Sequence, residues 1–185
     1  MLPSETIMPF KPASRAMALV IAAMLLTSCQ IGGSNSGTSV SRAGFKNNYM
    51  VARTALEAGD YAKASRQYAS LLRKAGPLEA RLRLEYAHAL LRDGKYRRAS
   101  DEARKVAVAL RGPGRSAALA VQGTADQEIA RAAIARGRGG ANAAERLIAA
   151  RVAFDEMLAN HPELDPLGAM AERRAVIDRE LAAIR

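Results

Sequence analysis

The chain has 185 residues, a formal net charge of +10, no tryptophan and a single cysteine. A lone cysteine excludes a fold held together by internal disulfides, and an aromatic content of 4% disfavours a single-stranded nucleic-acid surface, where bases stack on aromatic side chains. The abundance of alanine, leucine and arginine, with few β-branched and aromatic residues, favours helices.

The first predicted element is an apolar run, Ala16–Leu26, which precedes the only cysteine, Cys29. This run is too short to cross a hydrocarbon core of about 30 Å, which takes roughly 20 helical residues. It suits the hydrophobic region of a secretory signal, and Lys11 and Arg15 supply the positive region before it. We therefore expect residues 1–28 to be a signal peptide.

The expected cleavage site, Leu26–Cys29, reads Leu-Thr-Ser-Cys and resembles the lipobox of bacterial lipoproteins. The resemblance implies that Cys29 is acylated and becomes the first residue of the mature protein. Gln30 follows where an inner-membrane retention signal has aspartate. The resemblance therefore implies a lipid anchor in the outer membrane, on its periplasmic face. An ordinary signal peptide, or a short apolar helix that ends in cysteine, is the alternative.

Residues 29–44 are expected to form a flexible tether. They are rich in glycine, serine, asparagine and threonine, a composition that gives a flexible linker rather than a packed element. Without the signal peptide the net charge is near +9. The remaining part of the chain is long enough for one domain with its own core.

From residue 45 onward the pattern predicts an all-α fold, because no run of alternating apolar and polar residues indicates a strand. Glycines, prolines and polar clusters divide this part into helices. The expected bounds are 45–58, 60–75, 78–93, 95–111, 115–136, 141–160 and 166–184.

Two segments within this part repeat each other. Gly59–Leu72 reads GDYAKASRQYASLL, Gly94–Ala107 reads GKYRRASDEARKVA, and their first glycines are 35 residues apart. A third, weaker copy, Ala150–Pro162, lacks the glycine and the tyrosine. The spacing resembles the tetratricopeptide repeat, a helix–turn–helix unit of about 34 residues. The resemblance implies a right-handed α-solenoid of about three helix pairs over residues 45–164, closed by a capping helix at residues 165–185.

The repeat motif assigns packing roles to a few side chains. The glycines allow a sharp turn within each helix pair, the tyrosines pack into the joint between paired helices, and the alanines lie where two helices come close together. These residues are Gly59, Gly94, Tyr61, Tyr96, Ala64, Ala99 and Ala150.

The segments that connect the later helices also contain turn and capping motifs. RGPGR at 111–115 is expected to be a turn between repeats, and RGRGGAN at 136–142 an insertion, which in repeat arrays often binds partners. Pro162 is expected to end the second helix of its pair. Asp165 and Pro166 are typical of an N-cap and of the first residue of a helix.

In tetratricopeptide arrays the first helices of successive pairs line a concave face, so the resemblance implies a partner-binding groove on these helices. We expect this groove to be mostly basic and to bind an acidic segment or a terminal carboxylate of another protein. Solvated arginines on every face of a basic chain are the alternative explanation. The residues expected in the groove are Lys46, Tyr49, Arg53, Arg81, Leu84, His88 and Arg92.

No pattern in the sequence points to catalysis. The two histidines, His88 and His161, lack a partner at metal-ligand spacing, and His161 beside Pro162 is typical of a helix C-cap. No serine lies in a nucleophile-elbow pattern, and GRGG lacks the Lys-Ser/Thr that follows a phosphate loop. We expect a non-enzymatic protein with no metal, no cofactor and no nucleic-acid partner.

Two functions from different classes remain. The chain resembles the small lipoproteins that assist assembly of pili and secretion systems, such as the lipoprotein of the tight-adherence (Flp) pilus. This resemblance implies a scaffold that binds or localises another envelope protein. The alternative is a binding module for an anionic polymer, such as an acidic polysaccharide during its synthesis or export.

Overall fold

The computed structural model describes residues 36–184, which form an all-helical structure with no strand among them. The expected signal peptide, residues 1–28, and Cys29 lie outside the described residues. From Arg42 onward the chain forms one compact unit. The α-helices are α2 (Ser36–Glu57), α3 (Tyr61–Leu72), α4 (Glu79–Arg92), α5 (Tyr96–Ala109), α6 (Gly112–Ile134), α7 (Ala141–Asn160) and α8 (Ala169–Ala183), with short 3-10 helices η1 (Gly76–Leu78) and η2 (Pro162–Leu164).

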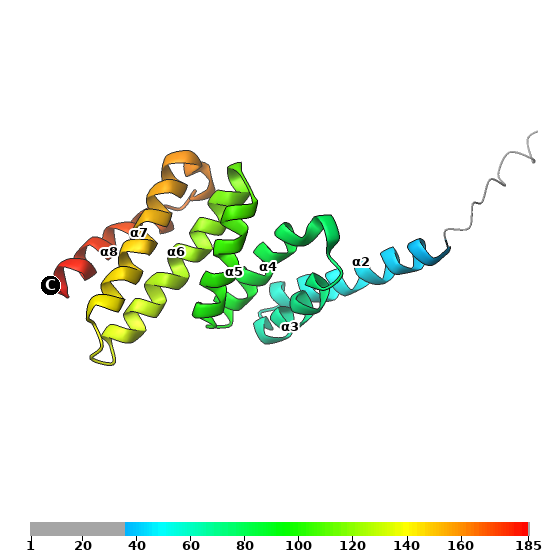
Figure 1. Cartoon of the computed structure of the whole chain (residues 1–185), viewed down its shortest axis with the longest axis horizontal. Helices are drawn as coiled ribbons and strands as arrows, with labels where there is room; N and C mark the ends of the chain where they lie inside the picture. The colour runs from blue at the N-terminus through cyan, green and yellow to red at the C-terminus, as the bar shows by residue number, and fades with distance from the viewer. Residues whose placement is uncertain (1–35, 185) are drawn as a thin grey trace, which may run out of the picture. The chain divides into compact units, whose positions relative to one another are not determined.

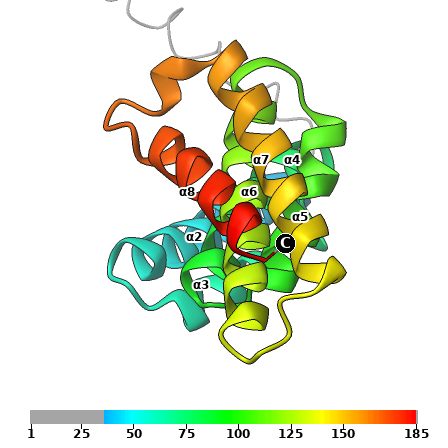
Figure 2. The same cartoon turned by 90° about the vertical axis from the view of Figure 1, so that its left-hand side faces the viewer.

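The helices pack in chain order, each against its neighbour (Figure 1). Alanines of α2 join the first core cluster together with side chains of α3 and α4. Contacts also link α4 to α6 and α6 to α8, so alternate helices touch as well. Figure 2 shows α8 lying beside α6 and α7 at the C-terminal end of this series.

The turns within the first two helix pairs have the same geometry. Gly59 and Gly94 have φ angles of 80° and 70°, in the left-handed region that glycine adopts without a steric cost. After Gly94, the Lys95 N–H donates to the Leu90 carbonyl oxygen at 2.9 Å, and the equivalent bond follows Gly59. This pattern closes the end of a helix and reverses the chain. The turns expected at both glycines are confirmed.

Alanine dominates the core. Among the described residues, fifteen of the 27 buried hydrophobic side chains are alanines, so neighbouring helices come close together and bury little side-chain volume. Ala64, Ala99 and Ala150 are each 0% exposed, as the repeat motif predicted. The largest fully buried side chains are Tyr68 and Phe154.

Three helices begin three or more residues away from the predicted start. α2 begins at Ser36 instead of 45, and its residues 42–44 are exposed, so this early part of the helix has no buried face. α6 begins at Gly112, because Pro113 fits the first turn of a helix, and the expected turn shrinks to two extended residues. α8 begins at Ala169 rather than at residue 166.

The late start of α8 has a clear cause. Pro166 is not its first residue, because a turn follows and Gly168 takes a left-handed conformation with φ 69°. Asp165 still caps the helix, since its Oδ2 accepts hydrogen bonds from the N–H groups of Met170 and Ala171, both at 3.0 Å. Pro162 follows the end of α7, as expected.

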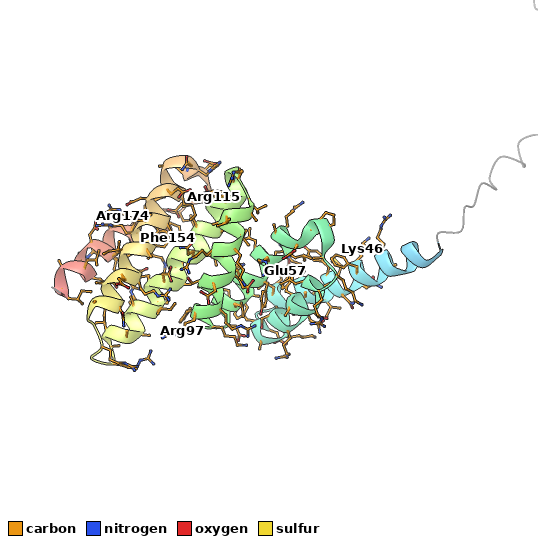
Figure 3. The ribbon with its side chains drawn as sticks, in the orientation of Figure 1. Lys46, Glu57, Arg97, Arg115, Phe154 and Arg174 are labelled. Carbon is orange, nitrogen blue, oxygen red and sulfur yellow. The ribbon has the colours of Figure 1, made fainter. Side chains whose placement is uncertain are left out.

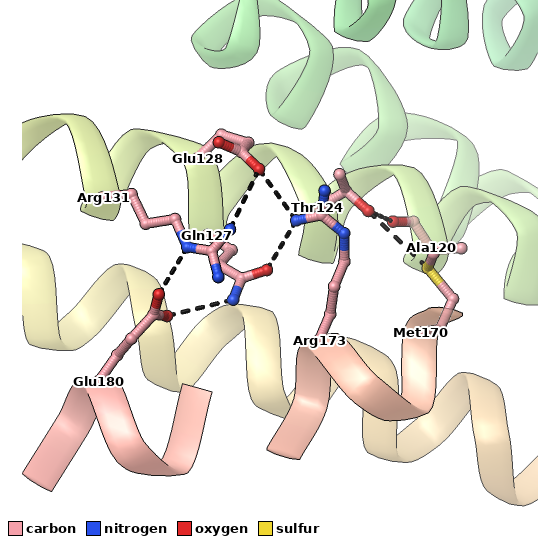
Figure 4. A network of polar contacts seen from close by, with 8 residues as sticks. All are labelled: Ala120, Thr124, Gln127, Glu128, Arg131, Met170, Arg173 and Glu180. Atoms are coloured by element: carbon pink, nitrogen blue, oxygen red, sulfur yellow. Dashed lines mark hydrogen bonds and ion pairs between the residues drawn. The ribbon is translucent and has the colours of Figure 1, made fainter. Parts of the chain in front are cut away.

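Polar side chains fasten α8 to α6 (Figure 4). Gln127 of α6 is fully buried, donates to Glu180 at 3.1 Å and accepts from Arg173 at 2.8 Å. Arg173 also bonds Glu128 at 2.9 Å, and Arg131 bonds Glu180 at 2.5 Å. A buried amide costs stability unless both of its ends are hydrogen-bonded, and α8 supplies both partners.

Candidate functional site

Three helices meet at one carboxylate, that of Glu85 on α4. The Tyr49 hydroxyl of α2 donates to its Oε1 at 2.9 Å, and the Tyr68 hydroxyl of α3 donates to its Oε2 at 2.6 Å. The two tyrosine rings lie edge to face with centroids 6.3 Å apart, a favourable arrangement for aromatic pairs. Glu85 therefore joins α2, α3 and α4.

The environment keeps both tyrosines protonated. Burial, reinforced by the hydrogen bond to Glu85, raises the pKa of Tyr68 and, in the same way, the pKa of Tyr49. Both hydroxyls therefore remain hydrogen-bond donors at neutral pH. The carboxylate between them accepts one hydrogen bond on each of its oxygens.

Arg53, one of the predicted groove cations, is engaged within the chain. Its Nε lies 2.6 Å from Glu57 Oε1, and its Nη1 lies 3.8 Å from Glu85 Oε2. The hydrogen bond to Glu57 and then the charge of Glu85 raise the pKa of Arg53. Two carboxylates offset this guanidinium, so it adds little net positive charge to the surface.

A pocket of about 240 Å³ opens between α2 and α4 beside Glu85. It brings together three of the predicted groove residues, Lys46, Tyr49 and Arg81. Figure 3 labels Lys46 on α2. The rest of the lining is mainly apolar and comes from Phe45, Leu78 and Leu82, with Glu85 at one side.

The other predicted groove residues of α4, His88 and Arg92, lie on the same face of the helix as Arg81 but have different surroundings. Arg81, Glu85, His88 and Arg92 recur at helical spacing, so they share one face of the helix. Desolvation by the surrounding atoms and then the charge of Arg92 lower the pKa of His88, so the imidazole is neutral at pH 7. Arg92 donates to the Tyr61 hydroxyl at 2.6 Å, with its guanidinium 5.0 Å from the centre of that ring.

Leu84 does not join this surface. It packs against the core cluster formed by α5, α6 and α7. Sequence reasoning in turn missed Glu85 and Tyr68, which organise the surface. Glu85 lies on the same helical face as Arg81, and the spacing in the sequence indicates this. Its bonds to Tyr49 and Tyr68, in contrast, depend on how three helices pack.

One serine–histidine contact resembles a catalytic pair but is structural. Ser116 Oγ lies 2.8 Å from His161 Nδ1. Ser116 is 3% exposed, so a substrate carbonyl could not reach its hydroxyl. His161 is also the C-cap residue of α7, as the sequence predicted. The contact ties the start of α6 to the end of α7.

The described residues contain no cluster of three or more histidine, cysteine, aspartate or glutamate side chains that could hold a metal ion. In the same residues, 36–184, no helix combines the length and the apolar character needed to cross a bilayer. Comparison of the chain with protein-family models, with curated proteins and with solved structures gives no match.

Proposed function

We propose that this chain is a non-enzymatic protein-binding scaffold built from tetratricopeptide-like helix pairs. The pairs are α2 with α3, α4 with α5 and α6 with α7, and α8 closes the array. The matched turns at Gly59 and Gly94 support this assignment. Contacts between α4 and α6 support it too, because each repeat of a solenoid packs on the next.

The observation that carries the proposal is the pocket between α2 and α4. Phe45, Leu78 and Leu82 offer an apolar lining for one side chain of a partner. Lys46 and Arg81 stand beside it and are exposed. A partner segment that places an apolar residue next to a carboxylate fits both the apolar lining and the two cations. Many peptides are recognised in this way, through side chains that enter pockets.

The proposed location rests on the sequence. The Leu-Thr-Ser-Cys motif supports an outer-membrane lipoprotein anchored through Cys29, with the helical domain in the periplasm. There the scaffold would assist assembly or localisation of an envelope complex such as a pilus or a secretion system.

Site-specific photocrosslinking tests the pocket. A photoreactive phenylalanine analogue at Leu78, which is 46% exposed and lines the pocket, should give a discrete protein adduct in intact cells. The same analogue at Leu167, 93% exposed on the loop before α8, should not. Lys46→Glu with Arg81→Glu should abolish the adduct, because the charges that pair with the partner are reversed.

Lys46 and Arg81 suit this test better than Arg53, which is paired with Glu57. In the part of the chain that the structure describes they form no salt bridge, so their reversal leaves the fold intact. Arg66→Glu with Arg179→Glu is the control of equal charge change on exposed residues. An adduct that persists in the first variant, or is lost equally in the second, contradicts the proposal.

A further inference from the structure

A larger cleft lies away from the pocket between α2 and α4. Its volume is about 720 Å³, and it is lined by the turn before α5, the first turn of α5, the last turns of α6 and the start of α7. The loop between α6 and α7, the predicted insertion at 136–142, forms part of its wall. The lining residues that matter below are Lys95, Arg97, Arg98, Arg136, Arg138 and Arg146.

The cleft is strongly basic. Six lysine or arginine side chains line it against a single carboxylate, that of Glu145. Acidic neighbours outside the lining offset only two of the six: Asp126 lies 2.7 Å from Arg146 and Asp93 lies 2.7 Å from Lys95. The other four cations form no salt bridge with any residue between 36 and 184.

Several of these cations are held in place before any ligand arrives. Arg98 donates to the Tyr86 hydroxyl, and its guanidinium lies 5.8 Å from the centre of that ring. Arg146 is fixed by Asp126, which is fully buried, and the Arg136 Nε donates to the Ala132 carbonyl oxygen at 2.8 Å. A group that is already ordered loses less entropy on binding.

Two of the basic residues stand where a helix disfavours them. The N-terminal ends of α5 and α7 both border the cleft, and neither has a side-chain cap or an acidic residue in its first turn. The partial positive charge of a helix N-terminus favours acidic side chains there, yet α5 carries Arg97 and Arg98 in its first turn. Stability of the helix alone does not explain this placement, whereas an anionic ligand does.

We propose that this cleft binds an acidic peptide segment that carries several aspartate or glutamate side chains. The arginines present planar donors that match carboxylates, and Ile129 and Ala133 provide an apolar floor for aliphatic parts of the segment. A single aromatic residue, Tyr96, is in the lining, so the cleft lacks the successive stacking surfaces that single-stranded nucleic acid uses. This site is separate from the pocket between α2 and α4 and does not depend on it.

Fluorescence anisotropy with the full chain in detergent tests the proposal. The probe is a short labelled peptide of alternating Glu and Ala, and its matched control has Gln in place of Glu. The acidic peptide should bind at least about tenfold more tightly than the Gln peptide. Its affinity should fall steeply from low to physiological salt, because exposed charges are screened over about 8–10 Å.

Two charge-matched variants locate the site. Arg97→Glu with Arg138→Glu removes two exposed cleft cations and should weaken binding of the acidic peptide by about tenfold or more. Arg66→Glu with Arg179→Glu makes the same change of charge on exposed residues outside both pockets and should leave binding within about twofold. Retained helical circular dichroism in both variants shows that each is folded.

The remaining outcomes decide against the proposal. Equal binding of the Glu and Gln peptides overturns it, and so does equal loss in the two variants. Tighter binding of a single-stranded oligonucleotide or of phosphatidylglycerol vesicles than of the acidic peptide assigns the cleft to phosphate groups instead. Failure of the photocrosslinking test at Leu78 would leave these results unaffected, so the two sites are tested separately.

Discussion

Gly123 lies in the middle of α6, where glycine ordinarily destabilises a helix relative to alanine. Phe154 of α7 explains its presence. A Cβ atom at position 123 would lie 2.9 Å from Cε1 and 3.0 Å from Cζ of the Phe154 ring. Because that ring is fully buried, it has no open space to move into. The absence of a side chain at 123 therefore sets how closely α6 and α7 approach.

Gly123→Ala should lower the free energy of unfolding by about 1–3 kcal/mol, the usual cost of overpacking a core, despite the gain in helix propensity. Gly44→Ala is the matched control, because Gly44 lies in α2 with nothing within 4 Å of the added Cβ. It should be neutral or stabilising by up to about 1 kcal/mol. Urea unfolding followed by circular dichroism measures both, and stabilisation by Gly123→Ala would refute the close-contact explanation.

The repeat motif predicts some of the close-contact residues and misses others. The motif marks Ala64 and Ala99, and both are fully buried. It misses Gly123 and Ala143, although Ala143 is 1% exposed. α6 and α7 carry alanine on several faces and lack the Gly-x-Tyr turn. Apart from Ala150, which the weak third copy of the motif marks, neither periodicity nor motif indicates which small residue lies in the contact.

At the scale of the elements, the sequence predicts helices better than it predicts their ends. The bounds of α7, 141–160, match the expectation. The start of α8 does not, because a capping residue need not adjoin the helix that it caps. The sequence predicts Asp165 as the cap, but three residues separate it from Ala169, where α8 begins.

Asp165→Ala should lower the free energy of unfolding by about 0.5–2 kcal/mol, the usual cost of losing an N-terminal cap. The two N–H groups that it accepts from, at Met170 and Ala171, would lose their partner. Asp165→Asn keeps an acceptor oxygen and should retain most of the stability. Hydrogen exchange should speed up first in α8. The exposed Glu163→Ala is the control, and if it equals Asp165→Ala in effect, the capping role is wrong.

Contacts between helices limit what could be predicted of the candidate site. The pairing of Arg53 with Glu57 follows from a spacing of four residues within one helix. The bond from Tyr49 to Glu85 spans 36 positions and depends on α2 packing against α4. A count of basic residues therefore overstates the positive charge of the predicted groove.

At the scale of the whole molecule, a net charge of +10 does not give a uniformly basic surface. Many arginines join neighbouring helices, as Arg115 does with Glu156 on α7 and Arg174 of α8 with Asp155. Figure 3 labels both arginines. The cleft beside the loop between α6 and α7 keeps cations, Arg97 among them, that no carboxylate in residues 36–184 neutralises. Alanine-rich contacts hold the helices close together, and four of the cations that form no salt bridge within residues 36–184 line that one cleft.

The proposed location of the whole chain depends on Cys29, and its replacement gives the last prediction. Cys29→Ser removes the only thiol, so the chain should no longer incorporate labelled palmitate and should remain unprocessed or appear as soluble protein in the periplasm. Ser28→Ala keeps a small residue at the cleavage site and should be processed normally. Cell fractionation with metabolic labelling measures both variants. Equal palmitate incorporation in wild type and Cys29→Ser would exclude Cys29 as the site of the lipid anchor and, with it, the proposed attachment through that residue.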